Sequence, residues 1–82
     1  IGIVEELLGA YKLRVTCLDG KTRLCRIPGR LRRRVWIKRG DIVLDAPWEF
    51  QEERGDVIYR YSQAEVRFLR RKGVIPPDFG VE

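Results

Sequence analysis

Nine lysine and arginine side chains, and no acidic ones, lie between Lys21 and Arg39. Within this basic segment, four arginines in five positions precede Trp36. Fixed positive charge binds nucleic-acid phosphates, and a flat indole can stack on a base. Arginine outnumbers lysine here, and its planar fork matches a phosphate. A surface kept only for solubility would mix the two signs of charge, so the segment favours a polyanion partner.

Two interpretations of Trp36 stay open at this point. The ring could stack on a flipped base or on a sugar of an RNA backbone. It could instead pack in the core, or under the arginines as a cation–π partner. Because Val35 and Ile37 are also apolar, the alternation does not decide which side chain points inward.

The other candidate groups have simpler interpretations. Trp48 and Phe50 stand among acids, and we expect them to cover one end of the fold rather than to contact a protein. The acids Glu49, Glu52, Glu53 and Asp56 lack the spacing of a calcium loop, so no metal site is expected. Arg67, Arg70, Arg71 and Lys72 could widen an RNA-binding surface or simply face solvent, with equal support for both.

Catalytic chemistry finds little support in the sequence. The chain has no His, its only serine is Ser62, and no phosphate-binding glycine motif is present. Cys17 and Cys25 have no imidazole to activate them and lack the CxxC spacing of a zinc site. We therefore expect a binding module without enzymatic activity or cofactor, with both cysteines as free, buried thiols in a reducing compartment.

The elements that must position these groups are mainly strands. Strands are expected over residues 2–8, 11–17, 22–27, 41–46 and 56–61, from alternating or apolar patterns. Asp19-Gly20 predicts a tight hairpin turn that pairs Cys17 with about Thr22. A short helical turn is expected over 30–34, and an acidic loop over 47–55. The predicted faces place Tyr11, Leu13, Val15 and Cys17 together.

The end of the chain predicts a helix. Ser62-Gln63-Ala64-Glu65 is a capping box, which starts a helix at about residues 62–72 that Gly73 ends. Pro76-Pro77 predicts an extended tail over 74–82. Five short strands and one helix favour a mainly β fold, a five-stranded OB-type barrel, with residues 1–73 as one domain.

Size and charge agree with a small basic binding domain. The 82 residues can bury only a thin core, and the net charge is +5. The charge is segmented, at +9 for residues 21–39 and −5 for residues 40–59. One face should therefore be basic and another edge acidic. No apolar run approaches the roughly 18 residues of a membrane span, and no signal-peptide pattern opens the chain.

Five blocks of the sequence, in order, resemble the translation initiation factor 1A family of archaea and eukaryotes. The blocks are Cys17 to Gly20, Arg23 to Ile27, Gly29 to Ile37, Gly40 to Leu44 and Asp56 to Tyr61. The loop Pro47-Trp48-Glu49-Phe50-Gln51 is similar to the archaeal form. The resemblance covers roughly residues 2–73, and five ordered blocks are more specific than a basic run alone.

The resemblance implies an OB-fold factor, the counterpart of bacterial initiation factor 1, that occupies the aminoacyl-tRNA (A) site of the small ribosomal subunit in the cytoplasm. Its implied partners are ribosomal RNA, other initiation factors and initiator tRNA, whose recruitment it assists. We expect a monomer that binds no membrane. The family's RNA contacts map onto Lys12, Arg26, Arg30, Arg32, Arg33, Trp36 and Lys38. The basic segment and the sheet face of Arg60 add Arg34, Arg39 and Arg60 to the predicted surface.

The alternatives differ in their target. Family members carry a basic N-terminal tail, which the sequence does not show. Eukaryotic members also have a long acidic C-terminal tail, whereas only Val74 to Glu82 follow the predicted helix, which favours an archaeal member. The main rival is a general single-stranded RNA-binding or chaperone module of the cold-shock or S1 type, which usually displays several aromatics on its sheet. A protein–protein adaptor would instead use Trp48, Phe50 and the acidic loop.

Overall fold

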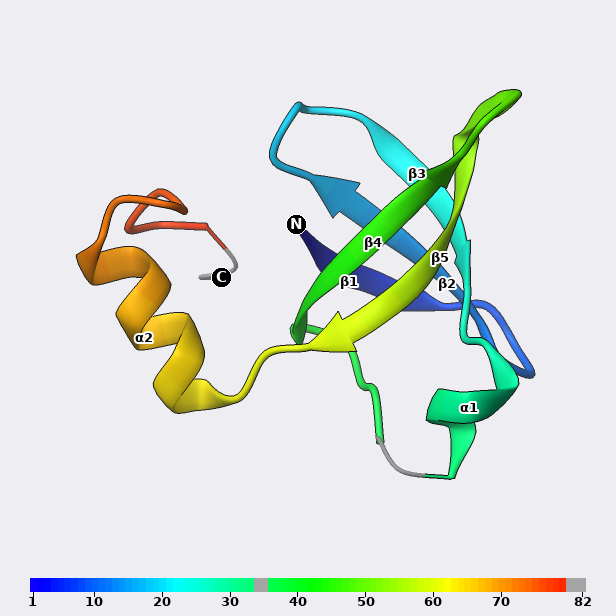
Figure 1. Cartoon of the computed structure of the whole chain (residues 1–82), viewed down its shortest axis with the longest axis horizontal. Coiled ribbons are helices and arrows are strands. Elements are labelled where there is room, and N and C mark those ends of the chain that lie inside the picture. Colours follow the sequence, from blue (N-terminus) through cyan, green and yellow to red (C-terminus); the bar gives the residue numbers. More distant parts are fainter. Residues whose placement is uncertain (34–35, 80–82) are drawn as a thin grey trace.

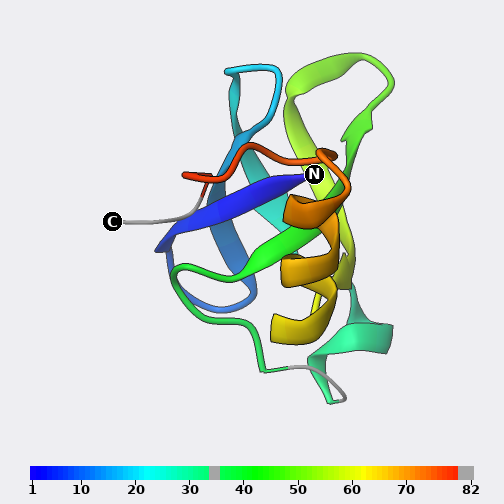
Figure 2. The ribbon, with the colours of Figure 1, turned by 90° about the vertical axis from the view of Figure 1, so that its left-hand side faces the viewer.

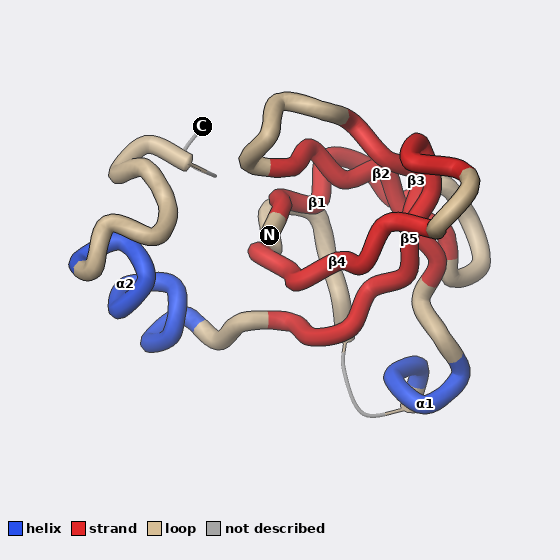
Figure 3. The backbone as a smooth tube through the Cα atoms, turned by 45° about the horizontal axis from the view of Figure 1, so that its top comes forward, coloured by secondary structure: helices blue, strands red, loops and turns tan. Residues whose placement is uncertain are grey.

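The chain closes five strands into a barrel in the order β1-β2-β3-β5-β4 (Figures 1 and 3). This computed structural model describes residues 1–33 and 36–79. The strands are β1 Gly2–Leu7, β2 Lys12–Cys17, β3 Thr22–Arg26, β4 Ile42–Trp48 and β5 Gln51–Arg60. The helices are α1 Gly29–Arg32 and α2 Gln63–Arg71. β3 and β5 pair in parallel, and the other neighbours pair antiparallel. The predicted mainly β, five-stranded OB-type barrel is confirmed.

Inward-facing residues of all five strands fill the barrel. Alternation places Leu13, Val15 and Cys17 of β2 inside, and β3 adds Cys25. Gly55 of β5 lies opposite Cys25, and a Cβ there would stand 2.8 Å from the carbonyl oxygen of Ala46. The glycine therefore lets β4 and β5 approach closely where the barrel turns.

Tyr11 does not join the inward face that the alternation predicts. Its side chain is exposed, and its backbone has φ of +62° in the turn that joins β1 to β2. The period-two pattern ends at Lys12 because the chain leaves the extended conformation one residue before the strand begins.

The first hairpin has a different register from the predicted one. Thr16 pairs with Thr22, and the Cys17 amide donates to the Lys21 carbonyl at 2.8 Å. The loop therefore holds three residues, with Gly20 at a φ of +85°, instead of a two-residue turn at Asp19-Gly20. Cys17 lies opposite Lys21 rather than Thr22. The expectation of free thiols is still confirmed, because both cysteines are buried and unbonded to each other.

The prediction of an acidic loop over residues 47–55 is wrong, because most of these residues belong to strands. β4 continues to Trp48 and β5 begins at Gln51, so these residues form a hairpin that projects from the barrel (Figure 1). Pro47 obscured the strand in the sequence, although proline is tolerated at the bulge that shifts the register between Pro47 and Trp48. We call residues 47–56 the acidic hairpin.

α2 begins and ends where the sequence predicts. Ser62 Oγ accepts the Glu65 amide at 3.1 Å, and the Glu65 carboxylate accepts the Ser62 amide at 2.8 Å, so both halves of the capping box form. Gly73, at φ of +73°, follows the helix. Residues 74–79 then turn back (orange to red in Figure 2) instead of running extended, because Ile75 is fully buried. The rest of the predicted tail, residues 80–82, lies outside the described residues.

Candidate nucleic-acid interface

An apolar contact and a backbone hydrogen bond hold the basic loop, which we define as residues 27–41 between β3 and β4. Leu31 of α1 packs against the core, and the Ile27 amide donates to the Tyr11 carbonyl at 2.8 Å. Unlike Leu31, its neighbours Arg30, Arg32 and Arg33 are exposed. The predicted helical turn over 30–34 is therefore present, one residue earlier. Arg34 lies outside the described residues.

These exposed arginines differ in their partners. No hydrogen bond or ion pair within residues 1–33 and 36–79 holds the side chains of Arg30 and Arg33. Arg32 is fixed instead, because its Nε donates to the Ile27 carbonyl at 2.9 Å and its guanidinium lies 4.0 Å above the Tyr11 ring. Arg30 and Arg33 are therefore available to an external anion, and Arg32 has a set direction.

Trp36 lies on the surface, at 85% exposure, while Ile37 beside it is buried. The interpretation of Trp36 as a core residue is wrong, because Ile37 supplies the apolar anchor at this point. The Trp36 carbonyl accepts a hydrogen bond from Arg60 Nη1 at 3.2 Å. Trp36 thus presents its indole to solvent in the same loop that carries the exposed arginines.

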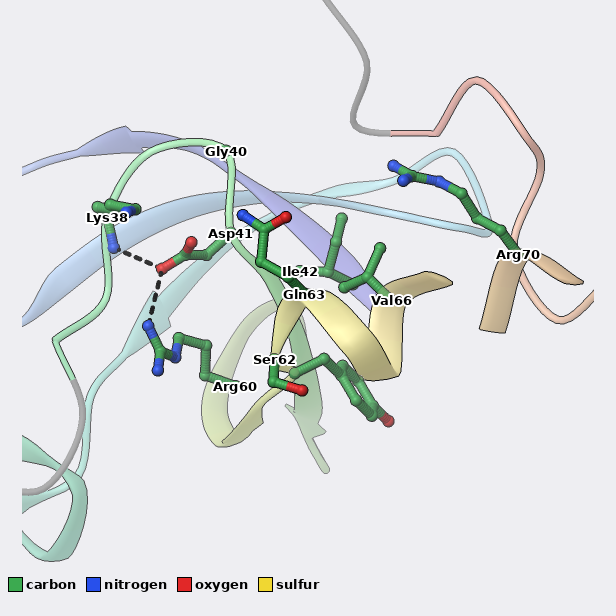
Figure 4. Close-up of a pocket in the computed structure, with 10 residues that line it drawn as sticks. Lys38, Gly40, Asp41, Ile42, Arg60, Ser62, Gln63, Val66 and Arg70 are labelled. Atoms are coloured by element: carbon green, nitrogen blue, oxygen red, sulfur yellow. Dashed lines mark hydrogen bonds and ion pairs between the residues drawn. The ribbon is translucent and has the colours of Figure 1, made fainter. Parts of the chain in front are cut away.

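Lys38 and Arg60 line a cavity of about 340 Å³ between the barrel and α2 (Figure 4). Asp41 Oδ2 accepts the Lys38 amide at 2.9 Å and lies 3.9 Å from Arg60 Nη1. Arg70, with Ser62 and Gln63, completes the polar lining. Asp41 therefore faces the Arg60 guanidinium, whereas Arg70 Nη2 donates to the Phe79 carbonyl at 2.7 Å. The Nε atoms of Arg60 and Arg70 are buried without a hydrogen-bond partner among the described residues.

Three further predicted cations, Lys12, Arg26 and Arg39, are exposed. Lys12 pairs with Arg26 across β2 and β3. The Arg26 guanidinium donates to Asp56 at 3.1 Å and lies 5.2 Å from the Trp48 ring centre. Arg39 Nε donates to the Glu5 carbonyl at 3.1 Å. Arg26 is thus largely engaged within the fold, and Lys12 stands beside it.

Trp48 and Phe50, which the sequence treats alike, diverge. The Trp48 ring is half-buried, donates to Asp56 Oδ1 at 3.1 Å and lies beneath Arg26. Burial of Asp56 opposes ionisation, but its hydrogen bonds from Arg26 and Trp48 outweigh this and lower its pKa. Phe50 does not cover the end of the barrel, since its side chain is 91% exposed.

Sequence reasoning missed one cation, Arg54. Its guanidinium lies 5.9 Å from the Trp48 ring centre, on the other strand of the β3–β5 pair from Arg26. Its place among Glu52, Glu53 and Asp56 concealed it, since the local net charge is negative. The parallel pairing of Arg54 with Leu24 brings it to the sheet surface near Arg26, and only knowledge of that pairing reveals it.

The described residues show no cluster of three or more His, Cys, Asp or Glu side chains able to hold a metal ion. Burial raises the pKa of Cys25 to about 12, which keeps this thiol protonated and unreactive at neutral pH. Over the same residues, no helix is long and apolar enough to cross a membrane. Cationic side chains and an exposed indole are the groups with which proteins contact the phosphates and bases of nucleic acids, and the loop that holds Trp36 combines them.

Comparison with known proteins identifies relatives of this chain. The family model for translation initiation factor 1A / IF-1 matches residues 1–82. Translation initiation factor 1A of Methanopyrus kandleri is 57% identical over 72 residues, which cover 88% of this chain and 65% of that protein. The Pyrococcus abyssi protein of the same name is 56% identical over 79 residues, covering 95% and 70%. The chain thus spans about two-thirds of the length of these relatives.

The fold is shared with a bacterial factor. The solution structure of translation initiation factor IF-1 from the Wolbachia endosymbiont of Brugia malayi superposes with a TM-score of 0.59 at 28% identity, over 83% of this chain and 82% of that one. The similarity to archaeal proteins covers the basic loop, the barrel and α2 alike. The chain therefore belongs to the translation initiation factor 1A / IF-1 family, whose members are non-enzymatic initiation factors.

Proposed function

We propose that this factor binds the small ribosomal subunit at its A site through ribosomal RNA and assists recruitment of initiator tRNA. The observation that carries the proposal is the end of the barrel where Trp36 is exposed and where Arg30 and Arg33 have no hydrogen bond or ion pair to any described residue. The closed barrel fixes the backbone position of these arginines, and Arg32 also has a set direction, so the group fits the phosphates of one folded RNA better than those of a flexible strand. The other initiation factors on the same subunit are the expected neighbours.

The cavity between the barrel and α2 supports a surface wider than the loop. Lys38, Arg60 and Arg70 place positive charge along this cavity. Arg60 also donates to the Trp36 carbonyl, which connects the cavity to the basic loop. The Nε atoms of Arg60 and Arg70 are buried, so these two guanidinium groups contribute positive charge to the surface rather than a free donor. The interface then runs from the basic loop to α2, with Lys12, Arg26, Arg39 and Arg54 at its margins.

Co-sedimentation with archaeal small ribosomal subunits, followed by chemical footprinting of the RNA, tests the proposal. We expect saturable binding and protection of A-site nucleotides. Log affinity should fall linearly with log salt, by ~0.7–0.9 for each phosphate neutralised. A flat salt response, or protection scattered over the subunit, would contradict the A-site proposal.

The same assay separates the rival function. A general single-stranded RNA-binding module would bind poly(U) as tightly as the subunit and would lose subunit binding in its presence. Such a module would use exposed aromatic side chains on its sheet to stack on bases. Tyr59 of β5 is unsuited to this role, because its hydroxyl donates to Glu65 at 2.7 Å and holds the ring against α2. We expect poly(U) to compete poorly.

A further inference from the structure

Tyr11 is in an unusual backbone conformation for a tyrosine. Its φ of +62° is the only positive value at a non-glycine among the described residues. Glycine or asparagine would adopt this conformation at lower cost. A residue kept in it against that cost points to a role for its side chain.

The Tyr11 side chain contacts Arg32, which the family resemblance places on the RNA surface. The Arg32 guanidinium carbon lies 4.0 Å from the ring centre, close enough for a strong cation–π contact. Arginine stacks flat on aromatic faces, so the ring fixes the plane of the fork.

Two hydrogen bonds through Ile27 also link Tyr11 to Arg32. The Tyr11 carbonyl accepts the Ile27 amide at 2.8 Å, and the Ile27 carbonyl accepts Arg32 Nε at 2.9 Å. The β1–β2 turn, the end of β3 and α1 are thereby tied at one point. Within the described chain, Nη1 and Nη2 of Arg32 have no hydrogen bond, so the two terminal groups of the fork stay available.

We infer that Tyr11 is a positioning residue that holds Arg32 as a preorganised fork for one RNA phosphate. The inference rests on the proposed RNA-binding function. A free arginine loses side-chain freedom when it binds, and that loss weakens affinity by about 2- to 12-fold for one ordered side chain. Arg32 already loses this freedom when the protein folds, because it stacks on Tyr11 and donates to the Ile27 carbonyl.

Three variants test the inference in subunit binding. Tyr11→Asn tolerates positive φ but removes the ring, so we expect about 2- to 12-fold weaker binding with no loss of melting temperature. Tyr11→Phe keeps the ring and should bind like the wild type. Phe50→Asn, which removes another exposed aromatic from the acidic hairpin, is the matched control and should leave binding unchanged.

A double-mutant cycle with Arg32→Gln separates positioning from direct contact. We expect Tyr11→Asn to change affinity less than about 2-fold when Arg32 is already absent. The salt slope should fall by ~0.7–0.9 in Arg32→Gln and stay at the wild-type value in Tyr11→Asn, since Arg32 still reaches its phosphate. An equal loss from Tyr11→Asn in both backgrounds would overturn the inference, because the ring would then contact RNA itself.

Relaxation of the Arg32 Nε–H group in the free protein tests the positioning without any ribosome. We expect a rigid group in the wild type and Tyr11→Phe, and a flexible one in Tyr11→Asn. Equal mobility in all three would overturn the inference. If Arg32 is rigid only with the ring present but the wild type binds no subunits, the positioning holds and the proposed function fails.

Discussion

The basic loop and the tip of the acidic hairpin lie at opposite ends of the barrel (Figure 1). Each region has one aromatic side chain that is highly exposed, Trp36 in the loop and Phe50 in the hairpin. Their charges are used differently. In the hairpin, Glu52 pairs with Lys21 at 2.9 Å and Asp56 with Arg26 at 3.1 Å. In the loop, no described carboxylate forms an ion pair with Arg30 or Arg33.

This difference indicates which charges support the fold and which are available to a partner. Paired surface charges contribute little binding capacity, because a new partner must first displace the old one. Unpaired arginines of one sign repel each other and gain most when an anion arrives. The loop should therefore control binding, and the hairpin should control local stability.

The largest effect is expected from charge reversal in the basic loop. Arg30→Glu with Arg33→Glu should weaken subunit binding by more than about 100-fold, since each charged hydrogen bond lost costs ~1.5–3 kcal/mol. Stability should change by less than ~0.5 kcal/mol, because both side chains are exposed. Binding is measured by co-sedimentation and stability by chemical denaturation.

The control has the same change of net charge on α2, in Arg67→Glu with Arg71→Glu. We expect a far smaller loss of binding from it than from the loop variant. Equal losses from the two double variants would mean either that α2 contacts RNA as strongly as the basic loop or that binding follows net charge alone. Either result would contradict the claim that the basic loop controls binding.

The two exposed aromatics give the next effect. Trp36→Ala should cost ~1–3 kcal/mol of binding free energy through lost stacking, with little loss of stability. Phe50→Ala should leave both quantities unchanged, because acids surround that ring and repel RNA. Loss of binding in Phe50→Ala would revive the protein–protein adaptor interpretation, in which the hairpin contacts a partner.

A stability effect is expected on the hairpin side. Asp56→Asn removes a carboxylate that accepts from both Arg26 and Trp48, and solvent screening limits the loss to about 1 kcal/mol. Because the folded-state pKa of Asp56 is lowered, its contribution is present above its ordinary pKa and disappears as pH falls through the folded value. Chemical denaturation should show that the wild type has the larger free energy of unfolding at pH 7. In acid, the difference between the wild type and Asp56→Asn should disappear. A gap between the two proteins that persists in acid would contradict this assignment.

Much of the fold followed from local patterns. The period of β2, the capping box at Ser62 and the glycine after α2 each depend on a few neighbouring residues, and all three predictions are confirmed. The predicted register of the first hairpin was wrong because it depends on a three-residue loop. The predicted extent of β5 was wrong because it depends on a bulge in its pairing with β4.

The candidate site was predictable in composition but not in arrangement. Clustered arginines marked the basic loop, since charge density can be read from the sequence. The exposure of Trp36 depended on Ile37 packing into the core, and the surface position of Arg54 depended on parallel pairing of β3 with β5. Contacts between residues far apart in sequence, such as Tyr11 with Arg32, leave no local pattern.

The smallest effect concerns the core that lies beneath both regions. Cys25 on β3, which leads into the basic loop, faces Gly55 on β5, which leaves the acidic hairpin. Cys17 Sγ donates to Asp45 Oδ2 at 3.3 Å, and burial raises the pKa of Cys17, so both thiols stay protonated. Melting temperature should therefore be equal with and without reductant, whereas loss of a native disulfide would cost ~2–5 kcal/mol. A scan at pH 7 with and without dithiothreitol, with thiol counting by maleimide after denaturation, measures this. A reductant-dependent drop would mean that a covalent bond restrains the strands under both regions, and the loop and hairpin could then no longer be treated as independent.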